Sequence, residues 1–265
     1  MTAATAKSFP LVAVDVGNSR VKLGLFKEPP RGSELPEPAR SLTLDSQLDE
    51  SKLSGWLPEG LNDAAWLIAS VQRDTTARLI ERLQAHNVMC VRLLLAADLP
   101  LTVDVPEPER VGIDRLVNAV AANRLRAVGR GAIVIDIGSA ITIDAVDADG
   151  VFLGGAILPG IGMSARALHE FTDLLPLSEM TELNDAPEPL GKSTVSALRS
   201  GLFWGAVGAM RELSVRLGSR LPQPQVFLSG GAAPTVARFL TNTDGEQAQY
   251  VPHLTLAGIA LSAGR

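Results

Sequence analysis

The hydrophobic positions along this chain follow two alternating periodicities. Short aliphatic runs bounded by glycine and polar residues predict buried strands at 11–17, 65–71, 131–138 and 224–231. Apolar positions spaced three and four residues apart predict amphipathic or buried helices at 75–87, 114–128, 162–175 and 193–217. Stretches rich in Pro and Glu at 28–40 and 181–192 predict exposed loops. Strands that alternate with helices are typical of mixed α/β sheets.

The strand pattern contains an internal repeat. Residues 12–21 read VAVDVGNSRV and residues 133–142 read IVIDIGSAIT, so Asp15 aligns with Asp136 and Gly17 with Gly138. The copies lie nearly half a chain length apart, which is too far for a solenoid repeat. We therefore predict two domains of one design, at 10–117 and 118–265.

Each copy ends in residues that could bind a phosphate. A strand delivers an Asp to its end, a glycine lets a backbone N–H approach a ligand, and small polar residues follow. A second strand follows directly, so each copy reads as a β-hairpin, and neither a Walker loop nor a GxGxxG fingerprint occurs. The alternative is an ordinary hairpin turn. Lys22, on the second strand, either neutralises phosphate charge or is a solvated edge lysine.

Composition narrows the possible partners. The formal net charge of −5 gives no electrostatic reason to expect nucleic acid or an anionic membrane as a partner. The N-terminus lacks a secretory signal and no apolar run reaches the length of a membrane span, so a cytoplasmic protein is expected. The single cysteine, Cys90, lies in an apolar stretch and is predicted to be a buried structural thiol.

These motifs resemble those of a known superfamily. DVGNSRVKLGLF, DIGSAITIDAV and VFLSGG resemble the first phosphate, second phosphate and adenosine motifs of the acetate and sugar kinase, Hsp70 and actin superfamily. PERVGIDR, GGAILPG and STVSALRSG, in this order, resemble type III pantothenate kinase, also described as Bvg accessory factor-like. The resemblance implies a duplicated actin-like (ribonuclease H-like) α/β fold with a nucleotide cleft between two similar domains.

The resemblance also implies an activity and roles for named residues. The activity is ATP-dependent phosphorylation of pantothenate to 4'-phosphopantothenate, the first step of coenzyme A biosynthesis, with Asp114 as proton acceptor. ATP contacts are implied for Asp15, Val16, Gly17, Asn18, Ser19, Arg20, Val21, Lys22 and Ser139. Pantothenate contacts are implied for Val105, Gly112, Ile113, Asp114, Arg115 and Thr194.

The implied cofactors are ATP, Mg²⁺ and a monovalent cation, K⁺ or NH₄⁺. Asp136 would hold the monovalent cation, and Asp15 would hold Mg²⁺ directly or through water. Members of the family are homodimers with the acceptor pocket near the subunit interface. The chain departs from the family pattern at two positions. Val105 stands where many members carry Tyr, and Ser139 stands where Thr is usual.

Alternatives remain open for the function and for Asp114. The chain could be another actin-fold kinase or phosphatase, or a non-catalytic regulator that retains the fold. The intact residues 112–115 favour the pantothenate kinase. Asp114 is predicted near the start of a helix, where an ionised carboxylate could simply be a cap.

Overall fold

The computed structural model describes residues 9–57, 64–178, 185–241 and 245–263. The chain forms two compact units. The first unit takes its residues from Met1–Thr102, Pro106–Leu125 and His253–Arg265, and the second from Val103–Val105 and Arg126–Pro252. Within the described residues, none of the helices combines the length and the apolar character needed to cross a membrane.

The first unit is built on a mixed sheet. Its strands are β1 (Leu11–Val16), β2 (Arg20–Phe26), β3 (Arg40–Asp45), β4 (Ala65–Ser70) and β5 (Cys90–Leu93). They lie in the order β3-β2-β1-β4-β5, with β1 antiparallel to β2 and parallel to β4. Its helical segments are α1 (Glu50–Trp56), α2 (Arg73–Ala85), η2 (Ala96–Asp98), η3 (Pro108–Arg110), α3 (Ile113–Leu125) and α7 (Leu254–Leu261).

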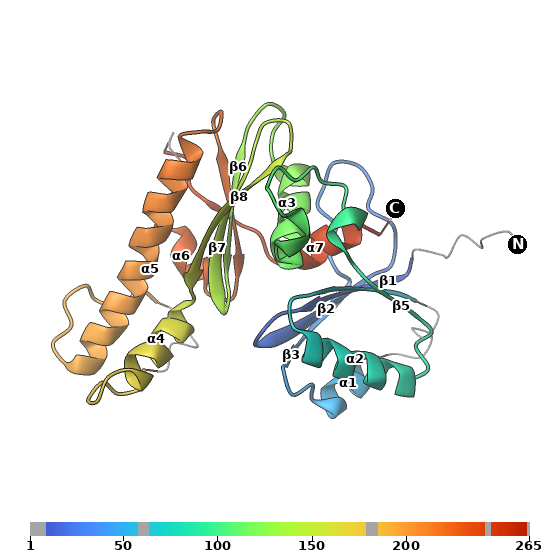
Figure 1. Ribbon diagram of the computed structural model, residues 1–265, viewed down its shortest axis with the longest axis horizontal. Coiled ribbons are helices and arrows are strands. Elements are labelled where there is room, and N and C mark those ends of the chain that lie inside the picture. Colours follow the sequence, from blue (N-terminus) through green and yellow to red (C-terminus); the bar gives the residue numbers. More distant parts are fainter. Residues whose placement is uncertain (1–8, 58–63, 179–184, 242–244, 264–265) are drawn as a thin grey trace, which may run out of the picture. The chain divides into compact units, whose positions relative to one another are not determined.

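Helices cover both faces of this sheet (Figure 1). Val12, Val14 and Val16 of β1 point to one face, where they join Leu53 of α1 and Leu79 of α2 in a buried cluster. On the other face α7 packs against β1 and α3. Because side chains alternate along a strand, Asp15 lies on the face that α7 covers.

The second unit repeats this sheet. Its strands are β6 (Ala132–Ile137), β7 (Ala140–Val146), β8 (Phe152–Pro159), β9 (Gln225–Gly230) and β10 (Gln249–Tyr250), in the order β10-β9-β6-β7-β8. As in the first unit, the first strand pairs antiparallel with the second and parallel with the fourth. The topologies are therefore the same, which confirms the duplicated α/β architecture predicted from the repeat.

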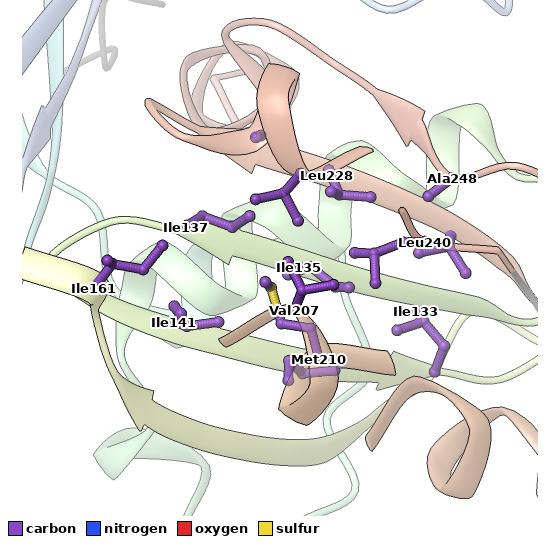
Figure 2. Close-up of a cluster of buried hydrophobic side chains, with 14 of the residues drawn as sticks. Ile133, Ile135, Ile137, Ile141, Ile161, Val207, Met210, Leu228, Leu240 and Ala248 are labelled. Atoms are coloured by element: carbon purple, nitrogen blue, oxygen red, sulfur yellow. The ribbon is translucent and has the colours of Figure 1, made fainter. Parts of the chain in front are cut away.

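One face of the second sheet packs against helices in a hydrophobic core. The helices are α4 (Ile161–Glu170), α5 (Thr194–Gly218) and α6 (Ala233–Ala237). Figure 2 shows Val207 and Met210 of α5 beside Ile135 of β6, within one cluster of buried side chains. Asp136 alternates with Ile135 and Ile137 and so lies on the opposite face of β6.

The compact units differ from the expected ranges 10–117 and 118–265 in three respects. Val103–Val105 belongs to the second unit. Helix α3 runs through Leu125 and stays entirely in the first unit, and so does the C-terminal segment from His253. The reason is packing: α7 is apolar on all sides, and a Cβ at Gly258 would lie 1.9 Å from the carbonyl oxygen of Val117 in α3. Long-range contact of this kind leaves no local sequence signal.

The structure also tests the predicted burial of Cys90 and the two predicted loops. The prediction that Cys90 is buried is wrong, because β5 is an edge strand and the Cys90 side chain is exposed. Residues 28–39 and 185–192 form neither helix nor strand, as predicted, whereas Arg40 begins β3. Residues 181–184 of the second predicted loop lie outside the described residues.

A pair of glycine substitutions tests the contact between α3 and α7. We expect Gly258→Ala to lower the free energy of unfolding by about 1–3 kcal/mol, because the new methyl group has no room beside Val117. Gly55→Ala in exposed α1, where a Cβ meets nothing within 4 Å, should instead raise it by up to about 1 kcal/mol. Urea unfolding of both variants measures the difference, and equal stabilities would contradict the packing.

Candidate active site

The first hairpin places a carboxylate and an ammonium group side by side. Asp15 of β1 lies directly opposite Lys22 of β2, and Lys22 Nζ is 3.5 Å from Asp15 Oδ2. The turn is closed by the Gly17 N–H, which donates to the Arg20 carbonyl oxygen at 3.0 Å. Lys22 is half-buried, and β2 lies between β1 and β3, so Lys22 is not a solvated lysine on an edge strand.

Asp114 is the second residue of α3 rather than its cap, since the helix begins at Ile113. Its Oδ1 accepts a hydrogen bond of 2.9 Å from the Arg115 N–H. A Cβ at Gly112 would stand only 2.5 Å from this same oxygen. Glycine at position 112 therefore leaves the space that the Asp114 carboxylate occupies.

The electrostatic state of Asp114 differs from that of an ordinary helix-terminal Asp. Burial raises the pKa of the Asp114 carboxyl above its usual value. The hydrogen bond from Arg115 and the positive charges of Arg115 and Lys22 act in the opposite direction but are weaker. Desolvation is therefore the largest influence on the pKa of this carboxyl, and it outweighs the groups that lower the pKa. The action of Lys22 on Asp114 also links this carboxylate to the first hairpin.

The second hairpin has the same strand–Asp–turn arrangement with a different partner residue. Asp136 lies directly opposite Thr142, so a hydroxyl stands where the first hairpin has an ammonium group. The Gly138 N–H closes the turn on the Ala140 carbonyl oxygen at 3.0 Å. Ser139, in this turn, is half-exposed, and its carbonyl oxygen accepts from the Gly160 N–H at 3.0 Å.

Two glycines in the second unit are required by close backbone contacts at this hairpin. A Cβ at Gly160 would stand 2.4 Å from the carbonyl oxygens of both Gly138 and Ser139. Gly230, at the end of β9 in the VFLSGG motif, has a φ of 101° and a Cβ there would lie 2.3 Å from the Ile137 carbonyl oxygen. The adenosine-like motif and the GGAILPG segment therefore both pack directly on the end of β6.

The remaining predicted acceptor residues lie in the second unit. Val105 Cγ1 is 3.6 Å from the Cβ position of Gly154 in β8. Thr194 is the first residue of α5, whose N-cap is Ser193, with the Ser193 side chain accepting from the Ser196 N–H. Thr194 also lines a groove of about 530 Å³ between α4 and α5; the lining residues are Leu168, Leu175, Thr194, Ala197, Leu198, Gly201 and Leu202.

Comparison with known proteins identifies the family. A family model described as type III pantothenate kinase matches residues 11–216. The type III pantothenate kinase of Paramagnetospirillum magneticum is 37% identical over 240 residues, which cover 86% of this chain and 88% of that protein. The one from Parafrankia sp. is 33% identical and covers 95% of this chain and 96% of its own length. The chain belongs to the type III pantothenate kinase family.

Solved structures support the fold. A Campylobacter jejuni structure named as a Baf family transcriptional activator superposes with a TM-score of 0.58 at 19% identity, covering 93% of this chain and 94% of that one. A type IV pilus biogenesis complex, PilM-PilN, gives 0.57 at 12% identity, with coverage of 98% and 100%. Such likenesses bear on the fold alone, and they agree with the duplicated actin-like fold implied by the motifs.

The residues present suit a metal that is shared with a ligand. Among the described residues no three His, Cys, Asp or Glu side chains come together as a metal site. Mg²⁺ is commonly bound by one or two carboxylates together with phosphate oxygens and waters. The Asp15 carboxylate, near the C-terminal end of its strand, fits that role.

Asp144 of the second hairpin is a further candidate residue whose side-chain direction the sequence alone leaves open. Asp144 is fully buried on β7 and lies opposite Val134, which places it on the same face as Asp136. A Cβ at Gly155 of β8 would stand 2.6 Å from Asp144 Oδ1, so this carboxylate extends over the neighbouring strand. The hairpin register is the signal that identifies the face; the glycine's purpose becomes visible only in three dimensions.

The raised pKa of Asp114 leads to a prediction about stability. A group whose pKa is raised on folding binds its proton more tightly in the folded state, so its contribution to stability is lost as pH rises through the folded pKa. Asp114→Asn keeps the shape without the charge. We expect this variant to melt at a higher temperature than the wild type near neutral pH.

The difference should shrink as pH falls toward the ordinary Asp pKa of about 3.9. Asp74→Asn is the matched control, because Asp74 is likewise the second residue of its helix but is exposed. Thermal unfolding of the three proteins without nucleotide, across acidic to neutral pH, measures the effect. A melting temperature for Asp114→Asn that tracks the wild type at every pH would contradict it.

Proposed function

We propose that this protein transfers the γ-phosphoryl group of ATP to pantothenate, giving 4'-phosphopantothenate and ADP, the first step of coenzyme A biosynthesis. The single observation that carries the proposal is the Asp114 carboxylate, held over Gly112 and influenced by Lys22, in a chain of the type III pantothenate kinase family. Partial desolvation brings the pKa of a carboxylate closer to the operating pH, which favours its action as a general base.

Asp114 is the proton acceptor. The primary hydroxyl oxygen of pantothenate attacks the γ-phosphorus, the bond to the β–γ bridging oxygen breaks, ADP leaves, and the hydroxyl proton passes to Asp114. A raised pKa makes the ionised carboxylate a stronger base than an ordinary Asp. Phosphoryl transfer is largely dissociative, so orienting the hydroxyl matters as much as taking its proton. The Arg115 N–H bond to Oδ1 fixes the carboxylate in that orientation.

The nucleotide side is assigned to residues 15–22 and to Ser139. Lys22, which already balances Asp15, offers positive charge to the phosphates. Bound Mg²⁺ would neutralise phosphate charge, with Asp15 as its protein ligand or as the acceptor of its water. A Cβ at Gly138 would meet nothing closer than 3.6 Å, so the chain's own packing does not require glycine there. Close approach of a phosphate to the turn does explain it.

Asp136 is assigned to a monovalent cation. Its carboxylate and the hydroxyl of Thr142 lie on one face of the sheet and offer oxygen ligands. K⁺ or NH₄⁺ is the cation that the family resemblance implies. On the acceptor side, Gly112, Ile113, Arg115, Val105 and Thr194 bind pantothenate, with the Arg115 guanidinium suited to a carboxylate.

We further propose that the protein is a homodimer through α5. An exposed stripe of small residues runs along this helix, made of Ala197, Gly201, Gly205 and Gly208. A Cβ at any of the three glycines would meet nothing within 4 Å. Each helical glycine costs about 1 kcal/mol relative to alanine, so the chain alone gains nothing from them. Close approach of a second copy accounts for the stripe, and a symmetric pair is the commonest arrangement.

The catalytic proposal is tested by Asp114→Asn. Loss of the base should lower kcat for pantothenate phosphorylation by at least about 10²-fold, at the lower end of general-base contributions. The KM for ATP should change little, because the substitution leaves the first hairpin intact. A coupled assay of ADP release, with pantothenate, glucose and acetate as alternative acceptors, measures both constants.

Asp74→Asn is again the control, and this variant should keep wild-type turnover. A folded Asp114→Asn protein with wild-type kcat would place the base elsewhere. An effect confined to KM for pantothenate would make Asp114 a binding residue only. Wild-type turnover of glucose or acetate in place of pantothenate would overturn the proposed substrate.

The dimer is tested by sedimentation velocity of the wild type and Gly205→Leu. We expect the wild type to be a dimer at micromolar concentration. Gly205 is exposed and a Cβ there meets nothing within 4 Å, so Gly205→Leu should stay folded while its dimer dissociates at least about tenfold more readily. A wild type that sediments only as a monomer would contradict the proposal.

A further inference from the structure

A short segment of the second unit lies along α5. The Trp204 Nε1–H donates to the Pro187 carbonyl oxygen at 2.9 Å. The Ser200 hydroxyl donates to the Pro189 carbonyl oxygen at 2.7 Å. Beyond these, a Cβ at Gly191 would stand 2.3 Å from the backbone nitrogen of Ala197. We name residues 187–191 the strap.

The order of these contacts shows how the strap runs. Pro187, Pro189 and Gly191 meet Trp204, Ser200 and Ala197 in turn, so the strap is antiparallel to α5 and approaches its N-terminus. Two residues of extended chain advance about 6.6 Å, and three or four helical residues advance about 4.5–6 Å. The two spacings are close enough for repeated contact. The chain then turns directly into the Ser193 cap and Thr194.

The strap contacts are specified by the side chains that make them. Ser200 is buried, and its hydroxyl is satisfied by the carbonyl oxygen that the strap supplies. Trp204 is held by edge-to-face contacts with Phe203 and Phe239 at centroid distances of 5.0 and 4.9 Å, which aim its N–H at Pro187. The Gly191 contact leaves no room for any side chain. An ordinary surface loop requires none of these three features.

The same turns of α5 form a wall of the groove that contains Thr194. Ala197 contributes to both, because it lines the groove and its backbone nitrogen contacts Gly191. Movement of the strap would therefore move Thr194 and the groove wall together. The strap shares no residue with the first or second hairpin.

We propose that the strap positions Thr194 for pantothenate, with Ser200 and Trp204 as positioning residues that act through it. This inference rests on the proposed function, since Thr194 is assigned to the acceptor there. The hydrogen bonds set the register of the strap, Gly191 allows it to reach the first turn of α5, and the Ser193 cap transmits that placement to Thr194.

The test compares two buried serines of the same helix. Ser200→Ala removes the bond to the strap, whereas Ser214 is equally buried and its hydroxyl has no hydrogen-bond partner among the described residues. We expect Ser200→Ala to raise the KM for pantothenate about two- to tenfold, as loss of one hydrogen bond allows. The KM for ATP should stay unchanged, and Ser214→Ala should leave both constants as in the wild type.

Limited proteolysis gives a second measurement that does not depend on enzyme activity. Lys192 is exposed at the end of the strap, so trypsin cleavage after it reports release of the strap. Ser200→Ala and Gly191→Ala should both be cleaved faster than wild type, and Ser214→Ala should not.

Each outcome bears on a different claim. Unchanged cleavage in folded Ser200→Ala and Gly191→Ala would overturn the strap itself. Faster cleavage with an unchanged KM for pantothenate, or an equal rise in the KM for ATP, would overturn its role in acceptor positioning. A wild type that does not phosphorylate pantothenate would overturn the proposed function and this role with it, while the cleavage rates would still decide the strap.

Discussion

The alternation of side chains along β1 and β6 is the constraint on which the rest of this structure depends. Val12, Val14 and Val16 on one face commit β1 to a buried cluster, and Ile133, Ile135 and Ile137 do the same for β6. Asp15 and Asp136 must then lie on the other face. A shift of one residue in register would bury both carboxylates in apolar cores, at a prohibitive cost in free energy. The strand register that buries the apolar side chains therefore also places the two carboxylates.

This constraint explains which features the sequence could predict. The strand–Asp–turn repeat is local, so both hairpins, their turns and the duplicated α/β architecture followed from pattern alone. Features that depend on distant contacts could not be predicted in this way: the exposure of Cys90 follows from its strand lying at an edge, and the placement of α7 follows from its contact with α3. Glycine 112 shows the limit most clearly, because its purpose is visible only once the Asp114 carboxylate is seen above it.

The candidate site uses opposite electrostatic solutions for its two carboxylates in the first unit. Asp15 is buried but has the Lys22 ammonium 3.5 Å away, which offsets the desolvation of its charge. Asp114 has only weaker help from Lys22 and Arg115, and burial prevails. The ion pair at Asp15 supports the Mg²⁺ role that we propose for that carboxylate, and the raised pKa supports the proton-acceptor role that we propose for Asp114. One lysine acts on both, so its removal would alter the two roles together.

Some glycines are required by packing within the chain, and others are not. At Gly160, Gly230 and Gly258 a side chain would collide with backbone, so packing within the chain is a sufficient reason for glycine there. At Gly138 a side chain would meet nothing closer than 3.6 Å, and at Gly205 nothing within 4 Å. A glycine that packing does not require destabilises a helix or strand and gains no contact within the chain. Its presence at the turn of the second hairpin supports the phosphate contact that we propose there, and its presence along α5 supports the proposed dimer.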